Sequence, residues 1–200
     1  MIDPRPVVLE GYGVRLEPLE ASHADALVSA AADGEVWKLW YVAVSELVPD
    51  RVNNWIETAL SGQRAGTMVP WVVRELTSGA IVGSTRYHDI VCPIDRVEIG
   101  FTFYAGRWQR THVNTACKLL LLSHAFDMLG CQVVGFRVDN LNHRSQAAME
   151  ALGARLDGVL RHFQPRLDGS PRDTYVYSIL AAEWPGVRAH LNARIQKHTN

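Results

Sequence analysis

Seven short stretches of the chain carry the hydrophobic and polar pattern of β-strands, either by alternation or by a run of β-branched and aromatic residues. They lie at residues 14–19, 69–74, 81–87, 97–103, 132–138, 159–164 and 175–180. Turn-forming residues at 77–79 and at 167–170 separate two pairs of these stretches, which predicts two hairpins. Much of the sheet is therefore expected to be antiparallel.

Helical patterns fill the intervals between these strands. They predict helices at 24–32, 50–60, 113–130, 142–153 and 184–196. Ser22 and Asn142 are suited to cap the first and the fourth of these helices, and Gly130 is suited to end the third. Because the third helix joins the strands on either side of it, those two strands must run parallel. The pattern thus predicts a single α/β domain over residues 1–200 with a mixed sheet.

Length and composition narrow the class of protein. Two hundred residues with 48% hydrophobic side chains suit one large domain with a substantial core. The 20 basic and 21 acidic residues nearly balance, which argues against a nucleic acid or an anionic membrane as a partner, and no apolar stretch is long enough to span a bilayer. Cys92, Cys117 and Cys131 form no C-x-x-C pair and the histidines lack metal-ligand spacing, so we expect free thiols, no metal and a cytoplasmic location.

Residues 109–115 form the predicted connection between the strand at 97–103 and the helix that follows it. Such a connection exposes unpaired backbone N–H groups and the positive end of the helix dipole, which suit a phosphate or pyrophosphate. The loop contains no glycine, which argues against both a Walker loop and a dinucleotide-binding fingerprint. An ordinary helix cap by Thr111 or Asn114 is the alternative interpretation.

Gln-Arg-Thr-His-Val-Asn at 109–114 resembles the acyl-coenzyme A loop of the GNAT superfamily of N-acetyltransferases, whose pattern is Gln/Arg-x-x-Gly-x-Gly/Ala. His112 and Asn114 stand where that family has small residues. Glu-Ile-Gly-Phe at 98–101 comes before this loop, and an apolar helix and then Asn-His-Arg-Ser at 142–145 come after it. This order is similar to that of the branch that includes ribosomal-protein N-terminal acetyltransferases, and the resemblance covers nearly the whole chain.

The resemblance implies a GNAT-like sandwich, with a mixed, mostly antiparallel sheet, two splayed parallel strands, and helices on both faces. It also implies an acetyl-CoA-dependent N-acetyltransferase, in which a primary amine attacks the thioester directly within a ternary complex. The pantetheine arm would lie in the gap between the splayed strands, where a backbone N–H would polarise the thioester carbonyl. The residues expected to bind acetyl-CoA are Phe101, Thr102, Phe103, Gln109, Arg110, Thr111, His112, Val113, Asn114, Thr115, Asn142 and Ser145.

Glu98 is the candidate general base for this reaction. An ammonium has no lone pair, so the acceptor amine must lose a proton before it attacks, and a carboxylate can remove that proton directly or through water. A surface glutamate paired with Arg96 or Arg86 is the alternative interpretation.

The acid for the leaving thiolate is less evident. Many family members have a tyrosine seven residues after the asparagine, but this chain has Met149 there, which has no proton to donate. Ser145 or a bound water is then the candidate acid. Helix capping by Asn142, with Ser145 as an ordinary first-turn residue, is the alternative.

The acceptor site is predicted from aromatic and polar residues. By the resemblance, Trp37, Trp40 and Tyr41 roof this site, although aromatic residues at these spacings also suit a core. Arg86 and His88 lie near the end of a strand that would face the acceptor, which is expected to be a small-molecule amine or a peptide N-terminus. A homodimer is left open, and a non-catalytic acyl-CoA sensor or scaffold is the rival interpretation.

Overall fold

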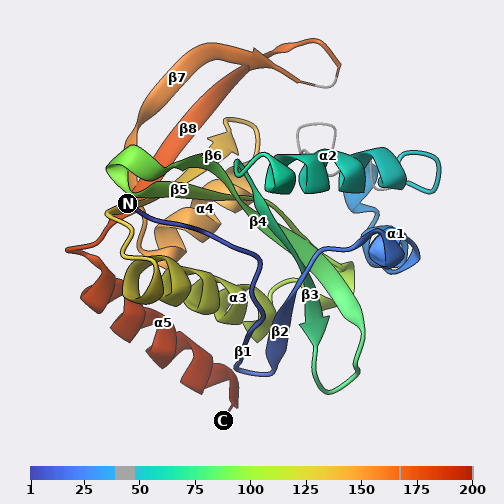
Figure 1. Cartoon of the computed structure of the whole chain (residues 1–200), viewed down its shortest axis with the longest axis horizontal. Helices are drawn as coiled ribbons and strands as arrows, with labels where there is room; N and C mark the ends of the chain where they lie inside the picture. The colour runs from blue at the N-terminus through green and yellow to red at the C-terminus, as the bar shows by residue number, and fades with distance from the viewer. Residues whose placement is uncertain (39–47, 167, 200) are drawn as a thin grey trace.

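The computed structural model describes residues 1–38, 48–166 and 168–199 of the chain. Within these residues, eight strands form one sheet in the order β1-β2-β3-β4-β5-β6-β8-β7 (Figure 1). All seven predicted strands are present, and β1 is an additional edge strand. Their bounds are β1 Leu9–Gly11, β2 Val14–Pro18, β3 Val69–Glu75, β4 Ile81–Val91, β5 Arg96–Tyr104, β6 Val133–Asp139, β7 Arg155–Pro165 and β8 Pro171–Leu180.

The strands β5 and β6 are the one parallel pair in the described sheet, and their pairing is short. It runs from Arg96 opposite Val133 to Glu98 opposite Gly135, and beyond these positions the two strands separate. All other neighbouring strands are antiparallel. The predicted mixed, mostly antiparallel sheet with two splayed parallel strands is therefore confirmed.

A bulge in β5 lies just beyond the point where this strand leaves β6. The register against β4 shifts between Ser84 and Arg86, and Phe101 has a φ of 50°. An extra residue in one strand bends it and changes which side chains face each side of the sheet. As a result, Ile99 packs in the core beneath α3, whereas Phe103 packs against the helices of the opposite face.

Within the described residues, five α-helices cover the two faces of the sheet, in the order predicted, and the helix predicted at 113–130 ends in a π-helical turn, His124–Met128. Figure 1 shows α1 and α2 on one face and α3, α4 and α5 on the other. Each face has its own hydrophobic core. None of the helices in the described ranges is long and apolar enough to cross a membrane. The bounds are α1 Ala24–Ala32, α2 Val52–Arg64, α3 His112–Ser123, α4 His143–Leu152 and α5 Trp184–Thr199.

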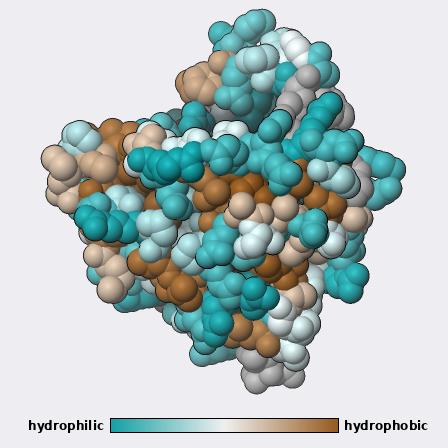
Figure 2. Space-filling view, turned by 45° about the vertical axis from the view of Figure 1, so that its right-hand side comes forward, coloured by the Kyte–Doolittle hydropathy of each residue, from teal (hydrophilic) through white to brown (hydrophobic). Residues whose placement is uncertain are grey.

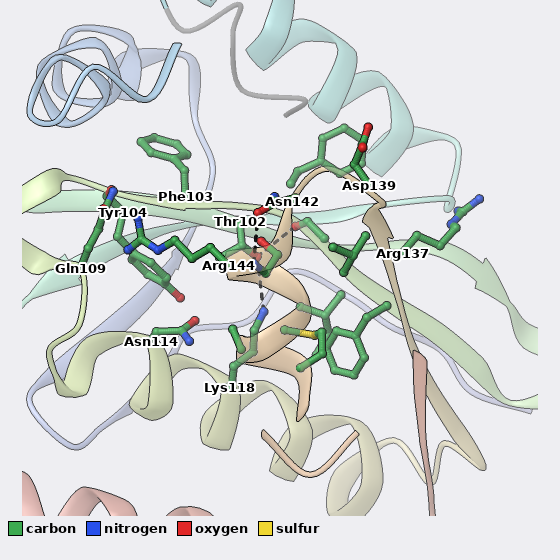
Figure 3. A pocket seen from close by; sticks show the side chains of 18 of the residues that line it. Thr102, Phe103, Tyr104, Gln109, Asn114, Lys118, Arg137, Asp139, Asn142 and Arg144 are labelled. Carbon is green, nitrogen blue, oxygen red and sulfur yellow. Dashed lines mark hydrogen bonds between the residues drawn. The ribbon is translucent and has the colours of Figure 1, made fainter. Parts of the chain in front are cut away.

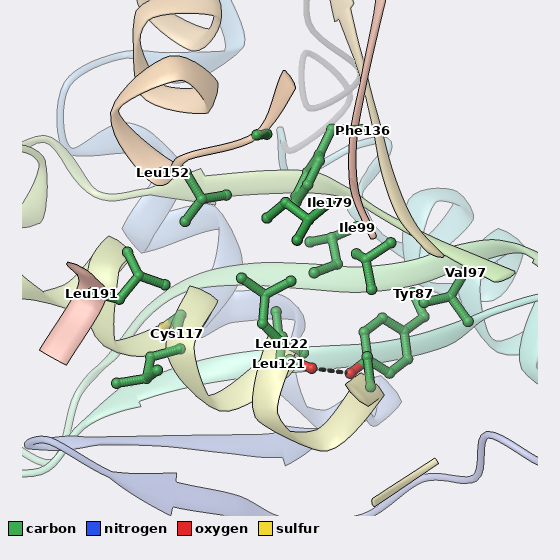
Figure 4. Close-up of a cluster of buried hydrophobic side chains, with 14 of the residues drawn as sticks. Tyr87, Val97, Ile99, Cys117, Leu121, Leu122, Phe136, Leu152, Ile179 and Leu191 are labelled. Atoms are coloured by element: carbon green, nitrogen blue, oxygen red, sulfur yellow. Dashed lines mark hydrogen bonds between the residues drawn. The ribbon is translucent and has the colours of Figure 1, made fainter. Parts of the chain in front are cut away.

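The helix α3 is apolar on most sides because it lies in the larger core. Leu119, Leu121 and Leu122 are at most 1% exposed and belong to the same core as side chains of β5 and β6. Figure 4 shows Leu121 and Leu122 in this core. Each such leucine contributes about 1.5–3 kcal/mol through burial. The Tyr87 hydroxyl of β4 donates to the backbone carbonyl of Leu121 at 2.5 Å, so its one polar group is satisfied. These contacts fix α3, and with it the loop at its N-terminus, against the sheet.

The predicted Ser22 cap of α1 is wrong. Residues Ala21–His23 first form a turn of 3-10 helix, and His23 takes the N-cap position of α1. The imidazole of His23 accepts a hydrogen bond from the backbone N–H of Glu20, and the Glu20 carboxylate accepts from the backbone of His23. This reciprocal pair caps the 3-10 turn, and Ser22 lies inside that turn.

The strands β7 and β8 form a long hairpin that stands out from the body of the molecule (Figure 1). Its outer part is the projection at the top of Figure 2, where the surface is mostly hydrophilic. The hairpin is longer at both strands than the sequence pattern predicts.

Candidate active site

A cavity of about 620 Å³ lies in the gap between the separated halves of β5 and β6 (Figure 3). Its walls are Ile99–Tyr104 of β5, residues 136–139 of β6, the loop before α3, and the facing sides of α3 and α4. This volume is in the range of small-molecule and cofactor sites. The cavity brings together Phe101, Thr102, Phe103, Gln109, Arg110, Thr111, Asn114, Thr115, Asn142 and Ser145 of the predicted cofactor-binding residues.

The loop before α3 presents free backbone donors to this cavity. Thr111 is the N-cap of α3, because its Oγ1 accepts a hydrogen bond from the Val113 N–H at 3.3 Å. Within the described residues, the backbone N–H groups of Arg110 and His112 donate to no acceptor. Arg110 has a φ of 62°, so the chain bends sharply just before the helix begins. Free amides in such a bend at a helix N-terminus attract an anion.

His112 and Val113 do not line the cavity with their side chains. Val113 is fully buried in the core beneath the sheet. The His112 ring points toward the turn between β1 and β2, where a Cβ placed on Gly13 would lie 3.3 Å from its Nε2 atom. The imidazole therefore does not occupy the place where the family has a small residue. At the N-terminus of α3, the backbone N–H is the group of His112 that suits an anion.

The N-terminus of α4 forms the opposite wall. Asn142 is the N-cap of this helix, and its Oδ1 accepts from the Ser145 N–H at 3.1 Å. Both residues line the cavity, and Met149 lines it one turn further along the helix. The capping alternative is thus observed for Asn142. The binding of acetyl-CoA by Asn142 and Ser145 stays a prediction.

Positive charge predominates around the cavity. The five arginines that line it in the described chain face one acidic residue, Asp139, which already accepts two hydrogen bonds from Arg166 at 2.8 and 3.1 Å. Arg144 reaches across to Gln109, whose Oε1 accepts from its Nη1 at 2.8 Å (Figure 3). The Nε of Arg172 is buried, makes no hydrogen bond within the described residues, and lies 3.6 Å from the Asp139 carboxylate. An excess of guanidinium groups over carboxylates suits a ligand with several phosphates.

Glu98 lies outside the cavity, in a buried cluster of charges. Its carboxylate is 2% exposed, accepts from Arg137 Nε at 2.6 Å and is ion-paired with Arg96, one of its two predicted alternative partners. Burial raises the pKa of Glu98, and the Arg137 guanidinium opposes that rise. The Nε2 atom of His88 is 4.0 Å from the same carboxylate, and burial lowers the pKa of His88 to about 4. The imidazole is therefore neutral near pH 7.

Arg86 is a buried cation on the same side of the sheet. It is 1% exposed, and its guanidinium lies between the rings of Trp55, at 3.9 Å, and Phe101, at 4.5 Å. In the described chain, its Nε and Nη2 have no hydrogen-bond partner, and burial lowers its pKa to about 9. Because an unpaired buried charge is costly, this guanidinium is poised for an anion or a carbonyl.

The predicted aromatic roof falls largely outside the described residues. Trp40 and Tyr41 lie outside them, and of Trp37 only the backbone is described, in the turn Val36–Lys38. His88 packs edge-on against the ring of Phe101, with 5.2 Å between ring centroids. Phe101 therefore joins the cavity to the group of residues around Arg86 and His88.

Lys118 is the main residue of the cavity that the sequence analysis missed. It belongs to α3, is 3% exposed, and lines the cavity between β5 and β6. The signal was present in the sequence, because Lys118 is the one charged residue within the apolar stretch at 113–122. A lysine in the middle of a core helix requires a reason.

A family model for the acetyltransferase (GNAT) domain matches residues 14–155. The chain therefore belongs to the GNAT acetyltransferase family. It is an N-acetyltransferase, and its acyl donor is acetyl-CoA. The free amides and arginines of the cavity fit the phosphates of this donor. The assignment made from the loop and its neighbouring motifs is confirmed.

Similar proteins support the fold assignment. The uncharacterized N-acetyltransferase YoaA of Bacillus subtilis (strain 168) is 24% identical over 175 residues, which are 86% of this chain and 96% of YoaA. A GCN5-related N-acetyltransferase from Brucella melitensis has a TM-score of 0.87 at 27% identity, over 96% of this chain and 87% of that one. Mycobacterium smegmatis RimJ, solved in complex with CoA-disulfide, has a TM-score of 0.79 at 21% identity, over 94% and 95% of the two chains.

Proposed function

We propose that this N-acetyltransferase acetylates an acceptor with one reactive primary amine and a carboxylate or carbonyl nearby, such as a peptide N-terminus or an amino acid derivative. The observation that carries the proposal is Arg86, a buried guanidinium beside Phe101 with two nitrogens that make no hydrogen bond within the described residues. A guanidinium donates charge-assisted hydrogen bonds, which suit the oxygen atoms of a carboxylate or carbonyl group. A polyamine would instead require several carboxylates around its charges. The two carboxylates of this cluster, those of Glu98 and Asp89, are both ion-paired with Arg96 and Arg137.

The proposed mechanism is direct attack of the amine on the thioester. The loop amides and the arginines hold the phosphates of acetyl-CoA, and the pantetheine arm lies between β5 and β6. Beyond Glu98, backbone N–H groups of β5 that face β6 have lost their partner strand, and one of them polarises the thioester carbonyl. Glu98 acts as the general base, since it lies on the same side of the sheet as Arg86 and its raised pKa favours proton uptake.

The acceptor class can be tested by competition. We expect a short peptide and amino acid amides to have higher specificity constants than spermidine. We also expect Arg86→Met to raise KM for the preferred acceptor by roughly 10–100-fold, because a hydrogen bond to a charged group contributes about 1.5–3 kcal/mol. Arg86→Lys is the matched control, which keeps the charge without the planar fork. A specificity constant for spermidine about tenfold above the others, which is about 1.4 kcal/mol, would refute this acceptor class.

A further inference from the structure

Lys118 projects from α3 into the gap between the splayed strands (Figure 3). Its Nζ lies 3.3 Å from the Oγ1 of Thr102 and 5.7 Å from the centre of the Phe136 ring. The Thr102 hydroxyl is in turn 2.8 Å from that of Thr85, so the lysine is held in place by a short chain of hydroxyl groups. In the described chain, these contacts engage one of its three N–H donors and pair it with no carboxylate.

The surroundings of Lys118 make its charge costly. Cys117 and Leu119 on either side of it are buried in the core, and burial lowers the pKa of Lys118 to about 8. Packing alone would be served better by leucine or methionine at this position. A cation that lines a cavity without a counter-ion is instead suited to meet an anion that arises inside that cavity.

The opposite wall lacks a strong proton donor. Met149 of α4 lines the same cavity and has no proton to give. Ser145 also lines it, but an alcohol is a far weaker acid than an ammonium. Breaking a thioester leaves negative charge on sulfur. Lys118, whose pKa burial lowers to about 8, is a stronger acid than Tyr104, which also lines the described cavity but whose pKa burial raises well above 10.

We propose that Lys118 is the general acid that protonates the sulfur of coenzyme A as it leaves the acetyl group. This inference rests on the proposed function, in which the thioester lies between β5 and β6. The acceptor nitrogen forms a bond to the acetyl carbon, the C–S bond breaks, and its electron pair remains on sulfur. Lys118 gives one Nζ proton to that sulfur. Glu98 takes the first proton from the acceptor ammonium, and the second proton, which leaves the nitrogen as the amide forms, returns to Lys118 through solvent, so the net products are amide, thiol and one proton.

Lys118 is expected to lose its proton near pH 8 before its uncharged neighbours lose theirs. Cys117 interacts with both Lys118 and Tyr104, and burial raises the pKa of Cys117 to about 12 and that of Tyr104 well above 10. Both therefore remain neutral while Lys118 loses its proton. The other charged side chains of the cavity are Arg110, Arg137, Asp139, Arg144, Arg172 and Arg194.

The first test is a pH profile of turnover for wild type, Lys118→Met, Lys118→Arg and Ser145→Ala. We expect wild-type kcat to fall above about pH 8, because Lys118 deprotonates there. Lys118→Met should lose about 100-fold in kcat with little change in the KM for acetyl-CoA, and Lys118→Arg should lose the alkaline decline. With the selenoester analogue of acetyl-CoA, whose leaving group needs no proton, the loss in Lys118→Met should largely disappear. Ser145→Ala should keep the alkaline decline.

The second test is a binding measurement that does not depend on turnover. The ultraviolet absorbance of the thiolate should show bound coenzyme A losing its thiol proton at lower pH in wild type than in Lys118→Met. Equal thiolate titrations together with equal pH profiles would overturn the role of Lys118 and leave the proposed function intact. Failure of the wild type to bind coenzyme A would overturn both. Thermal melting of each variant, with Lys118→Arg as the second substitution, establishes that the fold is retained.

Discussion

Glu98→Gln is expected to lower turnover by about 100-fold at pH 6 and by less than about twofold at pH 9. An α-amino group has a pKa near 8, so only about 1% of it is neutral at pH 6, whereas most of it is neutral at pH 9. Without the carboxylate, the enzyme depends on this neutral fraction. The affinity for acetyl-CoA should change little, because a general base acts on the proton of the acceptor. The measurement is kcat/KM for a peptide acceptor from pH 6 to pH 9.

The control for this prediction separates chemistry from ion pairing. Arg96→Gln removes one partner of Glu98 but keeps the carboxylate, so it should not reproduce the pH dependence. Glu98 is also the partner of Arg137, and its loss leaves two guanidinium groups with fewer contacts. If Glu98 only anchors these arginines, Glu98→Gln and Arg96→Gln will both lower activity equally at every pH, and the base role will have to be abandoned.

Two substitutions at His112 are expected to differ in their effect on the binding of coenzyme A. His112→Pro removes the free backbone N–H at the first residue of α3, where proline is well tolerated. Thr111 before it has an extended backbone, with φ −99° and ψ −175°, which a following proline prefers. The fold should therefore be retained. The dissociation constant of coenzyme A should rise roughly 10–100-fold, as expected for a lost hydrogen bond to a charged group, about 1.5–3 kcal/mol.

His112→Gly keeps the N–H and restores the small residue of the family, so the dissociation constant should stay the same or fall. Acetylpantetheine, which has no phosphate, is the control ligand. His112→Pro should leave its affinity unchanged. Isothermal titration with both ligands makes the comparison. Loss of coenzyme A binding in His112→Gly would mean that the imidazole itself contacts the ligand, contrary to its orientation toward Gly13.

The fold was largely predictable because its elements have strong local signals. Gly130 and Gly153 have φ values of 75° and 93° near the ends of their helices, as glycine favours there. The parallel pair of strands followed from the helical connection alone. The Ser22 prediction failed because Ala21–His23 form a turn of 3-10 helix before α1, with Glu20 as its N-cap, so that Ser22 lies inside this turn. Residue preferences for the N-cap do not show that such a turn precedes the helix.

The sequence predicts the loop of the candidate site, but it predicts less well which side chains of β5 and α3 face the cavity. The alternation of a strand places the side chain of Glu98 on the other face of the sheet from its two chain neighbours, but it does not say which face is buried. The bulge at Phe101 then shifts the phase of every later side chain on β5, so alternation across it would mislead. Lys118 was missed because a charged residue in an apolar helix is usually at its surface. Only the splay of β5 and β6 gives it a cavity to face.

The most direct test of the central claim, that the gap between β5 and β6 holds acetyl-CoA, is a thermal melt of the purified chain with and without this ligand. A ligand that binds only the folded state at one hundred times its dissociation constant stabilises that state by about 2.7 kcal/mol. For a domain of this size, that energy corresponds to roughly 5–10 °C in Tm. We predict a rise of this order with millimolar acetyl-CoA and a smaller rise in His112→Pro. An unchanged Tm in the wild-type protein would contradict the account.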